Sequence, residues 1–203
     1  MHRLILCLAL LLVVSTLPLA RADNDHRSQL HRVRTHLSGF NEVHFVAGDS
    51  TVTPIVPPAL RGAISTPSSG KFVAQIDEHG QKIHYELSYK NLRGTVTQGH
   101  IHFGQRHTVG GIVVWLCQVT TGPPGVPAPA AVAAATPECP AEGTVEGTIE
   151  PAQVLAQTAQ GFAAGDFDEL VRAILAGAAY VNVHSSVFGA GEIRGHLPSN
   201  HDD

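Results

Sequence analysis

Two histidines separated by a single residue are the first candidates for chemistry in this 203-residue chain. His100 and His102 lie in the stretch "QGHIHFG", residues 98–104. On a β-strand, residues i and i+2 project from the same face, so the two imidazoles would stand side by side and Ile101 would face the other way. Two neutral imidazoles can form half of a site for copper or zinc. The alternative is a polar pair that hydrogen-bonds to its neighbours and fixes the strand register.

Two later segments could complete such a site. In "YVNVHSS", residues 180–186, Asn182 and His184 share one face of a predicted strand and two valines share the other. If this strand lies beside residues 98–104, three imidazoles converge as a set suited to copper or zinc. The candidate ligands are His100, His102 and His184, with His84 or Glu192 as a possible fourth. Candidates for the surrounding hydrogen-bonding layer are Asn182, Glu192 and Arg194, where a carboxylate would orient an imidazole.

The elements that must position these side chains are mostly strands. Residues 72–77 and 83–90 alternate between apolar and polar side chains around the turn "EHGQ", which indicates a hairpin. Residues 111–119 are apolar almost throughout, which is typical of a strand buried on both faces. Two late segments favour short helices: residues 150–160, with Pro151 near the start, and residues 166–177, with Asp166 as N-cap and Gly177 as stop. The prediction is a mostly β fold, an immunoglobulin-like antiparallel β-sandwich or barrel with one or two short helices late in the chain.

The N-terminus has the pattern of a secretory signal peptide. Residues 1–22 combine Arg3, an apolar run over residues 4–14 and a small-x-small ending at Ala22. The run is too short for a membrane span, so we expect cleavage, no remaining span and a secreted or periplasmic protein. Removing Arg3 and Arg21 leaves 11 basic against 17 acidic residues, a net charge of −6, which argues against a nucleic-acid partner. The remaining divisions are a flexible leader (23–34), one domain (35–197) and a tail (198–203).

Two cysteines, Cys117 and Cys139, remain after removal of the signal peptide. In an exported chain such a pair is expected to form a disulfide, which the chain-entropy model values at about 3 kcal/mol for a loop of this length. The alternative is a pair of soft metal ligands. The segment between them, residues 118–142, is a loop rich in Pro and Ala that the disulfide would hold at both ends.

Four motifs in order resemble the CHRD domain, named after the repeats of chordin and found in bacterial exported proteins. They are "LSGFNEV" (37–43), "GHIHFG" (99–104), "YVNVHSS" (180–186) and "GEIRGHL" (191–197), so the resemblance covers residues 35–197. It implies an immunoglobulin-like β-barrel and implies little about activity. The loop 118–142 and the segment "SSVFGAGE" depart from the family pattern. "GHIHFG" is also similar to the copper-binding strand of copper/zinc superoxide dismutase, but the zinc-binding loop of that enzyme has no counterpart here.

No catalytic set accompanies the histidines. There is no G-x-S-x-G nucleophile motif, no phosphate-binding glycine loop and no paired acid–base spacing. The favoured hypothesis is a non-enzymatic exported module that binds a transition metal or an extracellular or envelope partner. The alternatives are a metal-dependent redox or hydrolytic enzyme that uses His100, His102 and His184, and a purely structural domain of the envelope or cell surface.

Overall fold

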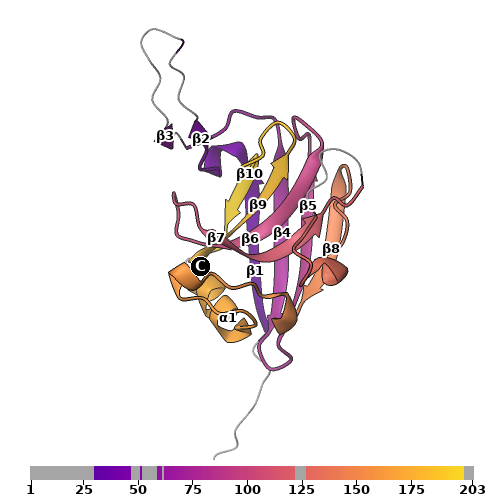
Figure 1. Ribbon diagram of the computed structural model, residues 1–203, viewed down its shortest axis with the longest axis vertical. Coiled ribbons are helices and arrows are strands. Elements are labelled where there is room, and N and C mark those ends of the chain that lie inside the picture. Colours follow the sequence, from indigo (N-terminus) through magenta and orange to yellow (C-terminus); the bar gives the residue numbers. More distant parts are fainter. Residues whose placement is uncertain (1–29, 47–50, 52–58, 61, 122–126, 199–203) are drawn as a thin grey trace, which may run out of the picture.

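The computed structural model describes residues 30–46, 51, 59–60, 62–121 and 127–198. Eight strands form one antiparallel sheet in the order β7-β6-β9-β10-β1-β4-β5-β8 (Figure 1). These strands are β1 (Leu30–Ser38), β4 (Ser69–Asp77), β5 (Lys82–Lys90), β6 (Val96–Phe103), β7 (Gly111–Gln118), β8 (Gly143–Ile149), β9 (Ala179–Ser185) and β10 (Ile193–His196). A separate short pair joins β2 (Phe45–Val46) to β3 (Ala59–Leu60). The short helical turn η1 (Gly39–Asn41) follows β1.

The sheet curls until it almost closes on itself. Its two edge strands, β7 and β8, contact each other. Tyr85 on β5 reaches across and donates its hydroxyl to the carbonyl of Leu116 on β7 at 2.6 Å. The prediction of a mostly β antiparallel fold is therefore confirmed. The specific immunoglobulin-like arrangement is not confirmed, because the eight strands form one continuous barrel-like sheet.

The barrel interior holds the main hydrophobic core. The predicted hairpin is present, and alternate residues of β4 and β5 face inward, as do Ile101 of β6 and both valines of β9. Strand β7 is buried on both faces, as its composition indicated. Its outward-facing Trp115 packs on Ala128 and Val132 in a second, smaller cluster. The loop after β7 therefore covers part of the outer face of the sheet.

The predicted disulfide between Cys117 and Cys139 is present. It joins the end of β7 to the far end of this loop, where backbone hydrogen bonds also connect Gln118 with Pro137 and Cys139. The Gln118 side chain donates to two loop carbonyls, those of Ala133 and Thr136. The described part of the loop, which contains the turn η2 (Ala133–Ala135), is thus packed against the barrel.

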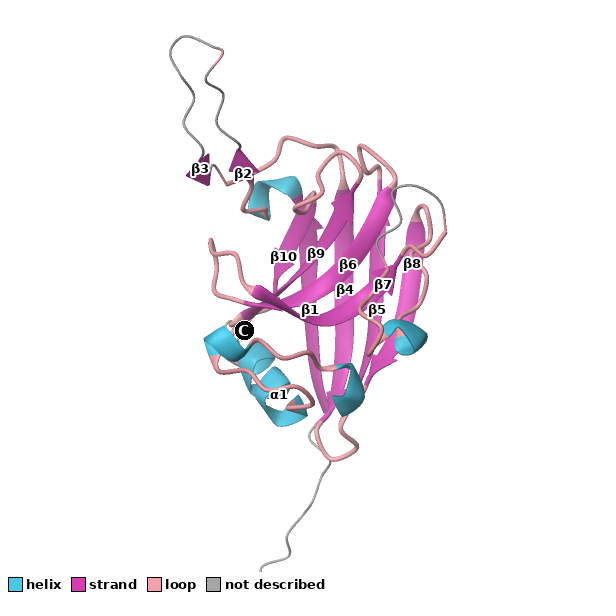
Figure 2. Cartoon of the chain, in the orientation of Figure 1, coloured by secondary structure: helices cyan, strands magenta, loops and turns pink. Residues whose placement is uncertain are grey.

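The two late helical segments differ from each other (Figure 2). Helix α1 (Phe167–Leu175) is confirmed, with Asp166 accepting from the backbone of Glu169 and Gly177 at a φ of 68° just after the end. Residues 150–160 form no α-helix and contain two short 3-10 turns, η3 (Pro151–Gln153) and η4 (Thr158–Gln160). The reason is tertiary: the backbone of Leu155 donates to Val113 of β7, so this stretch binds the sheet edge.

Strand β1 begins at Leu30, so residues 30–34 of the predicted leader are part of the sheet. The predicted signal peptide, the start of the leader and most of the tail lie outside the described residues. In the part of the chain that the structure describes, no helix is long and apolar enough to span a membrane.

Candidate metal centre

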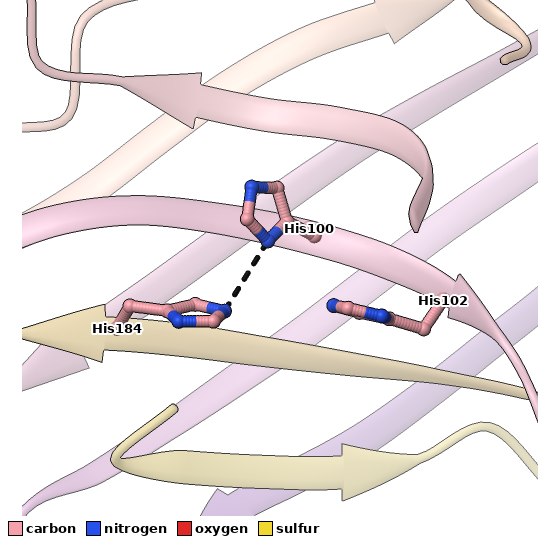
Figure 3. Close-up of side chains that lie close together, drawn as sticks. All are labelled: His100, His102 and His184. Carbon is pink, nitrogen blue, oxygen red and sulfur yellow. Dashed lines mark hydrogen bonds between the residues drawn. The ribbon is translucent and has the colours of Figure 1, made fainter. Parts of the chain in front are cut away.

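The three predicted histidines come together on the outer face of the sheet. Strand β9 pairs with β6, so that Asn182 lies opposite His100 and Tyr180 lies opposite His102. The valines of β9 and Ile101 occupy the inner face, which leaves the polar residues of both strands outside. One ring nitrogen from each of His100, His102 and His184 lies within 4.8 Å of the other two, and Figure 3 shows the three rings turned toward a common space. We call these three residues the histidine centre.

The centre is shielded from water although it lies outside the barrel. His100 is fully buried, and His102 and His184 are 7% and 6% exposed. Trp115 on β7 contacts the ring of His100 at 4.3 Å between centroids in an edge-on arrangement. The pairing of β6 with β7 shifts register twice, between Gly99 and His100 and between Ile101 and His102. Irregularities of this kind commonly re-aim side chains at functional sites.

Backbone carbonyls orient two of the imidazoles. Nδ1 of His102 lies 2.9 Å from the carbonyl of Gly110, and Nδ1 of His184 lies 3.0 Å from the carbonyl of Gly189. An imidazole that donates Nδ1–H to a carbonyl presents the lone pair of Nε2 on its other side. This is the usual orientation of metal-binding histidines.

The Asn182 side chain lies between these two lone pairs. Its Oδ1 is 3.0 Å from Nε2 of His102 and 3.1 Å from Nε2 of His184. Nδ1 of His100 lies 3.2 Å from the same His184 nitrogen, while its own buried Nε2 has no hydrogen-bond partner among the described residues. Asn182 was predicted to support the ligands from outside, whereas its Oδ1 lies as close to two ring nitrogens as a metal ligand would.

Burial keeps the three imidazoles neutral. Desolvation lowers the pKa of His102 to about 4, and it also lowers the pKa of His184. For His100, desolvation and then the neighbouring His184 and His102 hold the pKa well below its ordinary value of 6.5. The centre therefore offers uncharged, unprotonated nitrogens at neutral pH.

Arg194 and Tyr180 support the centre from the side of His102. The Tyr180 ring stacks on His102 with centroids 4.7 Å apart and accepts the Gly110 backbone N–H on its hydroxyl at 3.1 Å. The Arg194 guanidinium lies 3.3 Å from the Tyr180 ring centroid and donates to the carbonyls of Thr108 and Gln105. Arg194 thus fixes the loop 104–110, which carries the carbonyl that orients His102.

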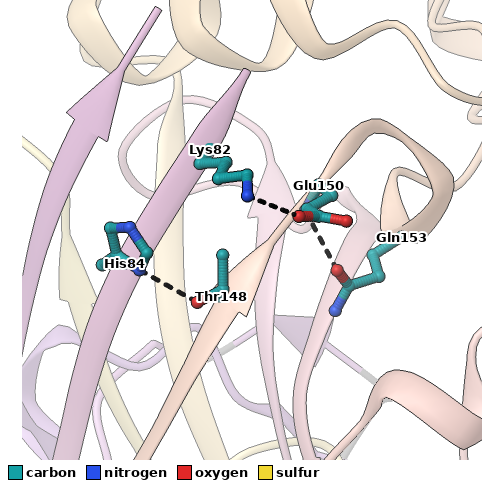
Figure 4. A network of polar contacts seen from close by, with 5 residues as sticks. All are labelled: Lys82, His84, Thr148, Glu150 and Gln153. Carbon is teal, nitrogen blue, oxygen red and sulfur yellow. Dashed lines mark hydrogen bonds and ion pairs between the residues drawn. The ribbon is translucent and has the colours of Figure 1, made fainter. Parts of the chain in front are cut away.

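Neither candidate for a fourth protein ligand reaches the centre. His84 lies exposed on β5, separated from β6 in the sheet order by four strands, and contacts Thr148 on β8 at 2.9 Å (Figure 4). The Glu192 carboxylate accepts hydrogen bonds from Ser185, Ser68, Thr66 and the backbone of Arg93, so it orients no imidazole. No ion pair joins Glu192 to Arg194 in the described structure. The strand face of Glu192 could not predict its partners, because most of the donors to its carboxylate come from loops that are distant in the sequence.

Sequence reasoning assigned no role to Glu42, in the motif "LSGFNEV". This residue is 4% exposed, its Oε1 accepts from the backbone of Val43, and its Oε2 has no regular hydrogen-bond partner among the described residues. Desolvation raises the pKa of Glu42, while Val43, Arg194 and the Asn182 amide act in the opposite direction. Its place in that motif was the only sequence signal, because a lone glutamate has no periodic or spacing pattern.

Comparison with known families gives one finding. The model of the family described as the CHRD domain matches residues 33–197, which is most of the chain. No match was found among curated proteins or among solved structures. The matched region contains β6, β9 and β10, and thus every residue of the histidine centre.

Proposed function

The chain belongs to the CHRD domain family, and we propose that it is an exported, non-enzymatic binding module that holds a copper or zinc ion at the histidine centre. The secretory pattern of residues 1–22 and the disulfide support export to an oxidising compartment, secreted or periplasmic. The metal is the part of this proposal that the geometry supports most directly.

The metal proposal rests on one observation: the closely packed nitrogen and oxygen atoms of the histidine centre need more protons for hydrogen bonds than the imidazoles carry. Five contacts join the three imidazoles to one another, to Asn182 and to two carbonyls. With the Asn182 amide oriented so that Oδ1 faces the rings and Nδ2 faces Glu42, the only protons for these contacts are the one that each neutral ring carries, which can serve at most three of them. When the carbonyls of Gly110 and Gly189 receive their protons, Oδ1 of Asn182 faces two bare nitrogens at 3.0 and 3.1 Å. A cation between these atoms removes the repulsion.

The spacing suits a first-row transition metal. Zinc–nitrogen bonds of about 2.0–2.1 Å place neighbouring ligands about 3.3 Å apart in a tetrahedral site. Three of the contacts between ligand atoms are 3.0, 3.1 and 3.2 Å, and the ligand nitrogens of the three imidazoles lie within 4.8 Å of one another, so the rings would have to close in around a bound metal. Three imidazoles and one amide oxygen are ligands that suit zinc and copper. When bound, the metal would be held by His100, His102 and His184, with Asn182 as fourth donor.

A site with four protein donors favours binding over turnover, because catalytic zinc sites keep one position open. This is why we favour a binding module over a metal-dependent enzyme. Measurable turnover in a loaded protein would support the alternative, a redox or hydrolytic enzyme. A structural envelope domain would show no metal dependence at all.

The test is metal content and thermal unfolding of the purified chain with and without Cu²⁺ and Zn²⁺. We expect one metal per chain and, at a free metal concentration about 1,000-fold above Kd, a stabilisation of about 4 kcal/mol. For a domain of this size that corresponds to a rise in Tm of about 8–16 °C. The variant His102→Gln/His184→Gln should lose both effects, and His84→Ala, which removes an exposed histidine on β5, should keep them. No metal uptake in the parent would refute the proposal.

A further inference from the structure

A pocket of about 360 Å³ opens on the protein surface beside the histidine centre. Residues 40–43, 62–63 and 107 line it. Backbone hydrogen bonds from Ala63 to Glu42 and from Ile64 to Gly39 join the two lining segments to each other. The pocket is thus built from segments that hydrogen bonds hold together.

Glu42 connects this pocket to the centre. It lines the pocket, is almost fully buried, and leaves Oε2 without a regular hydrogen-bond partner among the described residues. The Asn182 amide is the polar group beside this buried oxygen, and a cation or a further donor would lower the cost of burying the carboxylate. The exposed His107 lines the same pocket and adds an imidazole, so the pocket offers the oxygen and nitrogen ligands that a transition metal binds.

Asn182 lies between Glu42 and the histidines. Its Oδ1 faces His102 and His184, and its amide also interacts with the Glu42 carboxylate. Gly191, at a φ of 123°, keeps the space beside them free of a side chain. A Cβ at Gly191 would lie 2.6 Å from Glu42 Oε2 and 2.9 Å from Asn182 Nδ2. One carboxylate and one rotatable amide therefore separate the pocket from the metal-binding nitrogens.

We propose that this pocket is the port through which the metal ion reaches the histidine centre, with Glu42 and His107 as its first ligands. The inference rests on the proposed metal-binding function. The imidazoles and the amide carry no charge, so Glu42 supplies the negative charge on this side, with the Arg194 guanidinium as the cation that already interacts with it. Rotation of the Asn182 amide would turn Oδ1 from the histidines toward Glu42 to take up the ion, and the reverse rotation would return the oxygen to the histidine side. The port sets the rate of loading and release, and the centre sets the affinity.

The fluorescence of Trp115 can report metal binding at the histidine centre. Trp115 is the single tryptophan of the chain and contacts His100, so Cu²⁺ bound at the centre should quench its fluorescence. Stopped-flow mixing of the purified chain with Cu²⁺ gives the loading rate, and release into an excess of chelator gives the release rate. Glu42→Gln keeps the shape and the acceptor for Val43 but removes the charge. We expect both rates to fall about tenfold, with Kd unchanged, because the ion passes the same port ligand in both directions; the size is that by which electrostatic attraction commonly changes association rates.

Two further variants complete the design. Glu86→Gln removes an equal charge at an exposed position of β5 and should load at the parent rate. His107→Asn also removes a port ligand, and asparagine tolerates the left-handed φ of 62° at this position; it should slow loading as well. If Glu42→Gln loads at the parent rate, or weakens Kd without slowing loading, the port is refuted while the centre stands. If the parent itself shows no quenching and binds no metal, the centre is refuted and the port with it.

Discussion

Acidification should destabilise the metal-free protein through its buried imidazoles. Burial lowers the pKa of His102 from 6.5 to about 4. One pKa unit corresponds to about 1.4 kcal/mol, so His102 alone should contribute about 3 kcal/mol of pH-dependent stability. The sign follows from proton binding: between pH 6.5 and 4 the unfolded chain binds a proton that the folded protein excludes. The contribution is complete above pH 6.5 and is lost as the pH falls toward 4.

Folding also shifts the pKa values of other groups. Burial also lowers the pKa values of His100, His184 and His196, which steepens the loss of stability. The raised pKa of Glu42 opposes it, because the folded protein gains that proton more readily than the unfolded chain. The three histidines of the centre outnumber this single carboxyl. The free energy of unfolding should therefore fall by several kcal/mol between pH 7 and pH 4.5, a large share of the 5–15 kcal/mol typical of a domain.

The assay is urea unfolding in the presence of a chelator at several pH values, followed by Trp115 fluorescence. The matched variant is His102→Gln, which cannot take up a proton. Its stability should fall less steeply over this range, by up to about 1.4 kcal/mol per pH unit for the missing proton. Equal slopes for parent and variant between pH 5 and 6.5 would show that His102 is not held neutral by burial, and the reasoning would be wrong.

Three further predictions concern the surroundings of the centre and the disulfide. Asn182→Asp should tighten metal binding because a carboxylate replaces an amide oxygen. Asn182→Leu removes the proposed fourth donor and should weaken binding by at least the 10–100-fold seen when a residue that only supports a metal site is lost; competition with a chromophoric chelator measures both. Replacing Cys117 and Cys139 by serine should lower the free energy of unfolding by about 3 kcal/mol, measured in urea, whereas an unchanged value would mean that packing alone holds the loop. Arg194→Met should release the carbonyls of the loop 104–110, so amide hydrogen exchange there should speed up while β4 and β5 stay protected.

Local patterns predicted most of the elements that carry the centre. Alternation placed His100 and His102 on one face of β6, and it placed Asn182 and His184 on one face of β9. The cap at Asp166 correctly marked the start of α1. Such features depend on a few neighbouring residues, which is why the sequence alone reveals them.

Features that depend on distant parts of the chain were not predicted. Residues 150–160 have helical composition, yet their hydrogen bonds go to β7 and they form 3-10 turns. His84 and Glu192 have suitable side chains, but strand order and competing hydroxyl donors keep them away from the centre. Glu42 reaches the centre only because η1 folds back over the end of β10, a contact that no local pattern encodes.

The position of the histidines on the outer face of the barrel helps to decide between a structural network and a metal site. A polar row of His100, Asn182 and Arg194 crosses β6, β9 and β10 in register, which on an open sheet would face water and be stable without help. Here loops and Trp115 bury all three, so the row loses its hydration, and in the histidine centre the acceptors outnumber the ring protons. A structural network gains little from such an arrangement, because hydrophobic side chains of similar size would pack there at lower cost. A metal ion would turn the same surplus of lone pairs into coordinate bonds, and that is the physical reason to test this face for a metal first.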